Sequence, residues 1–140
     1  MAQFARLNPA TILVVENEAL VRLELTDRLA RSGLIVLVAS DADEAIDLLD
    51  VHPEIEVLFT DVTMPGSMDG IRLAHHVRGR WPPVKIIVAS GRIGSHLDDL
   101  PSGSLFLSKP YAPEALTVAL AQLMTGNGPG LADPPASLRA

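Results

Sequence analysis

The chain has 140 residues, 48% of them hydrophobic, and a formal net charge of −6. This size suits one globular domain, and an acidic balance without a basic cluster argues against a nucleic-acid-binding surface. The absence of cysteine excludes disulfides and thiolate metal sites. No apolar run reaches the roughly 18 residues of a membrane span, and the amino terminus has no signal-peptide core, so we expect a cytoplasmic protein without membrane contact.

Apolar strands and amphipathic helices alternate along the first part of the chain. The continuous apolar run at residues 11–15 predicts a strand buried on both faces, and the spacing of apolar residues predicts a helix over residues 18–31. Ser32 and Gly33 supply the stop signal of that helix. A second strand is predicted at residues 34–38, followed by a helix for which Ser40 is the candidate N-cap.

The same alternation continues toward the carboxyl terminus. Strands are predicted at residues 57–60, 84–89 and 104–107. Helices are predicted over residues 70–80, before a Pro-Pro pair, and from Pro113 onward. Glycines and a proline between the last two strands leave space for at most a short helix around residues 95–100, so the fourth helix is predicted to be short or degenerate.

Five strand–helix cycles predict an α/β fold. The expected architecture is a doubly wound five-stranded parallel sheet with right-handed crossovers and helices on both faces. One domain is predicted over residues 10–125, and the Gly- and Pro-rich tail at residues 126–140 is predicted to be disordered. This tail is too short and too polar to fold, so no output domain is expected.

Charged side chains come at the ends of three predicted strands. Asp61 follows the third strand, Glu16 and Glu18 follow the first, and Lys109 follows the last. Because the carboxyl ends of parallel strands form the ligand crevice of such sheets, these groups should meet. Neighbouring carboxylates repel each other unless a cation such as Mg²⁺ is bound, and a lysine supplies a mobile charge for an anion. Each acid alone is better explained as a solvated strand-end residue, but the joint pattern, which includes Ser90, is not.

Five short motifs in order carry a resemblance to a known family. They lie at residues 12–18, 60–61, 64–70, 89–91 and 108–110, and they include Glu-Asn-Glu, Thr-Asp, Met-Pro-Gly with Met-Asp-Gly, Ala-Ser-Gly and Ser-Lys-Pro. Together they resemble a response-regulator receiver domain over about residues 10–125. The resemblance implies a flavodoxin-like sheet with strand order 2-1-3-4-5.

The resemblance also implies phosphoryl transfer from a phosphohistidine to Asp61. The donor would be a histidine kinase or a histidine phosphotransfer protein. The implied Mg²⁺ ligands are Glu16, Asn17, Asp61 and the backbone carbonyl of Thr63. Lys109 would pair with a phosphoryl oxygen, Ser90 would be the switch hydroxyl, and Phe106 would be the switch aromatic. The expected protein is therefore a stand-alone phosphoacceptor regulator, not an enzyme acting on a separate substrate, which controls an unidentified protein target and is compatible with a homodimer.

Two alternatives belong to other functional classes. Asn17 stands where most receivers carry a second acid, which predicts weaker Mg²⁺ binding and motivates a phosphorylation-independent pseudo-receiver that only binds proteins. Retention of Asp61, Ser90 and Lys109 argues against this alternative. A flavin- or nucleotide-binding protein is less compatible, because the first strand-to-helix turn holds acids where a phosphate cradle needs glycine.

Overall fold

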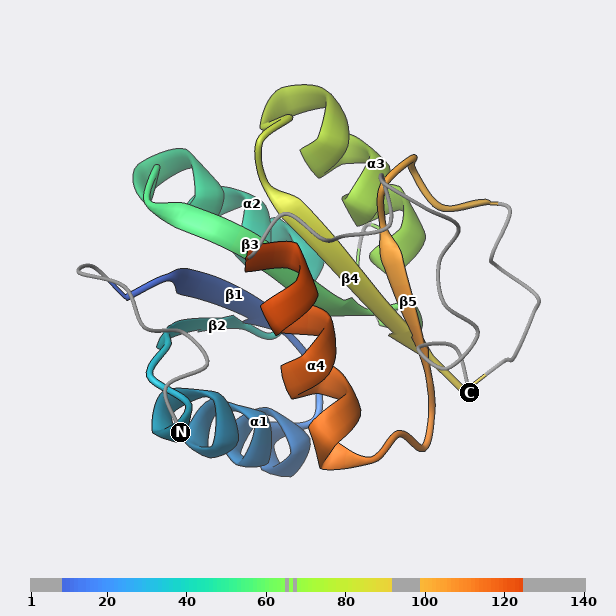
Figure 1. Cartoon of the computed structure of the whole chain (residues 1–140). Helices are drawn as coiled ribbons and strands as arrows, with labels where there is room; N and C mark the ends of the chain where they lie inside the picture. The colour runs from blue at the N-terminus through green and yellow to red at the C-terminus, as the bar shows by residue number, and fades with distance from the viewer. Residues whose placement is uncertain (1–8, 65, 67, 92–98, 125–140) are drawn as a thin grey trace.

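A computed structural model describes residues 9–64, 66, 68–91 and 99–124 and shows a three-layer α/β fold (Figure 1). The strands are β1 (Thr11–Val15), β2 (Ile35–Ala39), β3 (Ile55–Asp61), β4 (Lys85–Ser90) and β5 (Leu105–Ser108). The described helices are α1 (Ala19–Arg31), α2 (Ala42–Val51), α3 (Gly70–Arg80) and α4 (Pro113–Met124). All strand pairs are parallel, in the order β2-β1-β3-β4-β5, which confirms the predicted doubly wound sheet.

The core consists of two apolar layers, one on each face of the sheet. Ile12 and Val14 of β1 point into the layer under α1 and α4, while Leu13 and Val15 point into the layer under α2 and α3. Every residue of β1 is buried. This burial on both faces explains why the strand is a continuous apolar run and not an alternating one.

Helix boundaries follow from local capping, with one correction. Gly33 has a φ of 94° and ends α1 as predicted. The prediction that Ser40 caps α2 is wrong: Asp41 is the N-cap, and its carboxylate accepts a 2.9 Å hydrogen bond from the backbone N–H of Glu44. The backbone N–H and the hydroxyl of Ser40 instead donate to the Glu44 carboxylate, at 2.7 and 2.9 Å. Asp41 therefore caps the helix, while Glu44 accepts hydrogen bonds from the residue just before the cap.

β3 differs from its predicted extent of residues 57–60. It begins at Ile55, because a register shift opposite the start of β1 pairs Thr11 with Ile55 and Ile12 with Val57. Its last residue is Asp61, so this carboxylate belongs to the strand and not to the loop. Residues 95–98 of the predicted short helix around residues 95–100 lie outside the described residues, and the predicted tail at residues 126–140 lies wholly outside them.

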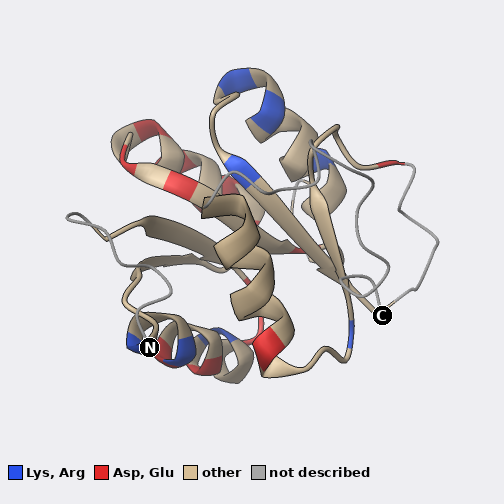
Figure 2. Ribbon diagram, viewed as in Figure 1, with Lys and Arg blue, Asp and Glu red and all other residues tan. Residues whose placement is uncertain are grey.

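Charges are separated on the surface of the α2–α3 layer (Figure 2). Exposed acidic side chains gather on α2, at Asp43, Glu44, Asp47 and Asp50. Basic residues gather at the end of α3 and the start of β4, at Arg78, Arg80 and Lys85. An ion pair between Arg80 and Asp50, at 2.8 Å, joins the two groups. In the described part of the chain, every helix is too short or too polar to cross a membrane.

Arg78 joins the end of α3 to the start of β4, and its removal should destabilise the fold. Its Nη1 donates to the backbone oxygens of Pro82 and Val84, both at 3.0 Å. We expect Arg78→Met to lower the free energy of unfolding by about 1–2 kcal/mol, because it leaves one partly buried carbonyl without its donor. Urea denaturation checks this, with Arg72→Met on the exposed side of α3 as the control. Equal effects of the two substitutions would contradict a joining role for Arg78.

Candidate functional site

The site lies at the carboxyl edge of the sheet, where Asp61 and Lys109 meet. Lys109 directly follows β5, and its Nζ donates to Oδ2 of Asp61 at 3.0 Å. The Asp61 side chain is 13% exposed, so the pair is only partly screened by water. The peptide bond between Lys109 and Pro110 is cis. The two groups are 48 residues apart in the chain, and the structure brings them together as the strand pattern predicted.

Backbone hydrogen bonds between the strands continue for one residue beyond the ends of β3 and β5. The N–H of Val62 donates to the carbonyl of Ala89 at 3.0 Å, which extends the pairing of β3 with β4. The N–H of Lys109 donates to the carbonyl of Ser90 at 2.8 Å, which extends the pairing of β4 with β5. The sheet itself therefore holds the main chain at the ends of the strands that carry Asp61 and Ser90, and at Lys109.

The loop after β3 folds back so that Gly70, at the start of α3, packs against the backbone of Asp61. The N–H of Gly70 donates to the carbonyl of Val62 at 2.8 Å, and Asp69 caps α3 by accepting from the N–H of Arg72 at 2.9 Å. A Cβ on Gly70 would lie 1.9 Å from the carbonyl oxygen of Asp61, so no side chain fits there. The sequence predicted a helix that begins at Gly70, but it did not reveal this contact with the site.

Glu16 is buried at the end of β1, beside Asp61. It is 3% exposed, and its Oε2 accepts a 3.0 Å hydrogen bond from the backbone N–H of Glu18. Burial raises the pKa of Glu16; the hydrogen bond from Glu18 opposes this increase, and the negative charge of Asp61 adds to it. Arg22 of α1 donates to the Glu16 carbonyl at 2.8 Å and holds the turn. The carboxylate of Glu18 makes no capping hydrogen bond on α1.

The other predicted site residues occupy different environments. Asn17 and Thr63 are exposed, in the turns that follow β1 and β3. Ser90 is 2% exposed at the end of β4, and Phe106 is 4% exposed within β5. Among the described residues, no group of three or more His, Cys, Asp or Glu side chains is placed to hold a metal ion. A cation at this edge would therefore need amide or carbonyl oxygens in addition to two carboxylates.

The family model described as response regulator receiver domain matches residues 12–121. This chain belongs to that family. The receiver is 31% identical over 129 residues to a chemotaxis protein CheY homolog of Campylobacter jejuni, covering 87% of this chain and 98% of that protein. Several other curated relatives are longer, and the receiver spans between 12% and 53% of their length.

Solved structures agree with this family. A response regulator receiver protein from Sinorhizobium medicae superimposes with a TM-score of 0.79 at 27% identity, covering 87% of the receiver and 99% of that chain. A CheX–CheY complex with BeF₃ and Mg²⁺ from Borrelia burgdorferi superimposes with a TM-score of 0.74 at 25% identity, covering 83% and 90%. The sheet order and the alternation of strands and helices are therefore those of a receiver fold.

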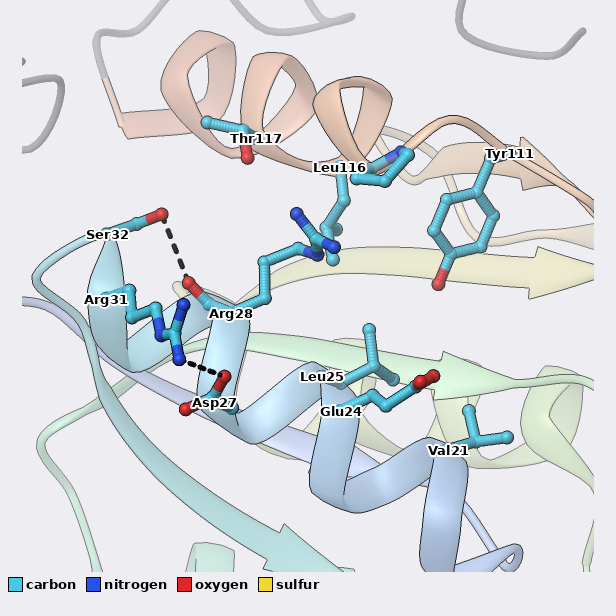
Figure 3. Close-up of a pocket in the computed structure, with 11 residues that line it drawn as sticks. Val21, Glu24, Leu25, Asp27, Arg28, Arg31, Ser32, Tyr111, Leu116 and Thr117 are labelled. Atoms are coloured by element: carbon cyan, nitrogen blue, oxygen red, sulfur yellow. Dashed lines mark hydrogen bonds and ion pairs between the residues drawn. The ribbon is translucent and has the colours of Figure 1, made fainter.

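A groove between α1 and α4 lies next to the site of the receiver. Figure 3 shows Tyr111 at one end of this groove, with Arg28 reaching across from α1 toward Leu116 of α4. The Tyr111 ring stands edge-on to Phe59 of the core, with 6.4 Å between ring centroids and an interplanar angle of 84°. Burial raises the pKa of Tyr111 to about 12, and the negative charges of Glu16 and Asp61 contribute.

This phenol gives a direct test of the electrostatics of the receiver, because Tyr111 is the single tyrosine of the chain. We expect its ultraviolet absorbance to titrate at about pH 12 in the folded protein, against an ordinary value of 10.0. The folded state keeps the phenol proton longer than the unfolded state does, so stability should fall as the pH rises from 10 toward 12. Glu16→Gln should lower this pKa, and titration at the ordinary value would contradict the burial of Tyr111.

Proposed function

We propose that this receiver accepts a phosphoryl group on Asp61 and acts as a switch in a two-component phosphorelay. The observation that carries the proposal is the 3.0 Å pair of Asp61 with Lys109, set beside the buried Glu16 at one edge of the sheet. The donor would be the phosphohistidine of a histidine kinase or of a phosphotransfer protein. The receiver would then act through a downstream protein target or a second copy of itself.

The proposed step needs a nucleophile and a neutralising charge. A carboxylate oxygen of Asp61 forms a P–O bond while the P–N bond of the phosphohistidine breaks, and the electron pair of that bond stays on the imidazole nitrogen. Phosphoryl transfer depends mostly on in-line positioning and on neutralisation of the phosphoryl oxygens. The contact of Lys109 Nζ with the Asp61 carboxylate supports this role for Lys109.

The donor atoms at this edge fit Mg²⁺. Carboxylates of Glu16 and Asp61 with the amide of Asn17 and the carbonyl of Thr63 are hard oxygen ligands, and waters complete such sites. Burial makes ionised Glu16 costly, as its raised pKa shows, and a cation offsets that cost. When bound, Mg²⁺ would supply further neutralisation of the phosphoryl oxygens. Because an amide is neutral, Asn17→Asp should lower the Mg²⁺ concentration needed for phosphorylation, which a metal titration measures.

The readout is proposed to involve Ser90 and Phe106 on the neighbouring strands β4 and β5. In the register of these strands, Phe106 pairs with Val88, two residues before Ser90 on the same face. A phosphoryl group on Asp61 adds acceptor oxygens to which the Ser90 hydroxyl can donate. Rotation of Ser90 toward that group changes the space beside Phe106, so a local hydrogen bond would alter the packing of the edge strand.

Intact-protein mass spectrometry with a small-molecule phosphodonor tests the phosphorylation proposal. We expect a Mg²⁺-dependent phosphoryl adduct on the wild type that disappears in Asp61→Asn. Asp43→Asn, on the exposed surface of α2, should keep the adduct and serves as the matched control. Absence of the adduct in folded wild-type protein would overturn the proposal and favour a phosphorylation-independent interaction module.

A further inference from the structure

A buried hydroxyl without a partner lies next to the proposed switch residue. Ser108 is the last residue of β5 and is 2% exposed. Its Oγ makes no hydrogen bond in the described structure. Burying a hydroxyl without a hydrogen-bond partner costs free energy, so the unpaired hydroxyl of Ser108 at the edge of the proposed site needs an explanation.

The register of the sheet places this hydroxyl beside Ser90. The two serines are paired across β4 and β5. Their neighbours Ala89 and Leu107 point into the α1–α4 layer, so alternation directs both serine side chains to the opposite face. Paired residues on adjacent strands lie about 5 Å apart, and rotation about χ1 brings two hydroxyls on one face within hydrogen-bond distance.

We propose that Ser108 is a second hydroxyl of the switch, which donates to Ser90 Oγ when Ser90 donates to the phosphoryl group on Asp61. This inference rests on the proposed function. A hydroxyl that receives a hydrogen bond becomes a better donor, so the two bonds reinforce each other. Because Ser108 is unpaired in the unphosphorylated state and paired in the phosphorylated one, it favours the phosphorylated arrangement. Ser108 is thus a positioning residue, which acts through Ser90.

The first test uses beryllofluoride with Mg²⁺ as the probe for the phosphoryl group. We expect Ser108→Ala to weaken beryllofluoride binding about fivefold, the worth of one net hydrogen bond. The melting temperature of the free protein should not fall, because the substitution removes no existing bond. The matched control is Ser104→Ala, which removes another buried hydroxyl without a partner, just before the opposite end of β5. This control should leave the affinity for beryllofluoride unchanged.

A double-mutant cycle distinguishes the proposed hydrogen bond from Ser108 to Ser90, called the relay below, from a purely structural effect of the substitution. In a Ser90→Ala background, where the acceptor is missing, Ser108→Ala should cause no further loss of affinity. An equal loss in both backgrounds, or an unchanged affinity of Ser108→Ala in the wild-type background, would overturn the relay. If the wild type acquires no adduct and binds no beryllofluoride, the proposed function fails together with this inference. If the wild type binds the probe but the cycle shows no coupling, only this inference fails.

Discussion

Gly70→Ala should lower the free energy of unfolding by more than about 3 kcal/mol, although it adds only one methyl group. The new Cβ would lie 1.9 Å from the carbonyl oxygen and 2.7 Å from the carbonyl carbon of Asp61. Both atoms belong to the backbone of a central strand, so they cannot move aside as a flexible side chain would. The strand end or the start of α3 must shift, and urea denaturation measures the cost.

Gly79→Ala is the matched control, because it lies in the same helix and nothing lies within 4 Å of its added Cβ. We expect this substitution to raise the free energy of unfolding by about 0.5–1 kcal/mol, because alanine loses less conformational freedom than glycine in a helix. A Gly70→Ala protein as stable as the Gly79→Ala protein would show that the loop does not return to Asp61 as described.

Lys109→Met should slow phosphorylation of Asp61 by at least about 100-fold, since it removes a preorganised positive charge from the reacting group. The methionine keeps most of the length and apolar stem of lysine. The rate at which the phosphoryl adduct appears in mass spectrometry, at saturating phosphodonor, measures the loss. Without Lys109, the charge of Glu16 would face Asp61 without that counter-charge. Burial raises the pKa of Glu16, so the defect should grow as the pH rises and Glu16 ionises.

The control for Lys109 is Lys85, the other lysine of the chain, which is exposed at the start of β4. Lys85→Met changes the net charge by the same amount but at the opposite end of the sheet, so its rate should match the wild type. Equal slowing of both variants would indicate a general charge effect and would contradict a direct role for Lys109.

Much of the fold could be predicted because parallel strands buried on both faces have a recognisable composition. The apolar run that forms β1 is one example, and its carboxyl end places Glu16 at the edge of the sheet. The meeting of Asp61 with Lys109 follows from the same rule, since each comes at the end of a strand. These predictions needed only local patterns and the geometry common to parallel sheets.

What could not be predicted depends on atoms that are close in space and separate in sequence. The contact that requires Gly70 depends on how far the loop folds back, which turn residues do not specify. The orphan hydroxyl of Ser108 depends on the register of β4 with β5. The cap of α2 at Asp41 depends on competition among three neighbouring polar side chains, where propensity alone favours none.

The backbone hydrogen bonds that extend beyond the strand ends restrict how this receiver can move. Amides such as those of Val62 and Lys109 should exchange with solvent slowly, because exchange requires the hydrogen bonds between paired strands to open. A change at this edge therefore costs less free energy when side chains rotate than when the hydrogen-bonded main chain moves. In the proposed switch, the sheet would stay fixed, and the groups that move would be the hydroxyls of Ser90 and Ser108 and the ring of Phe106.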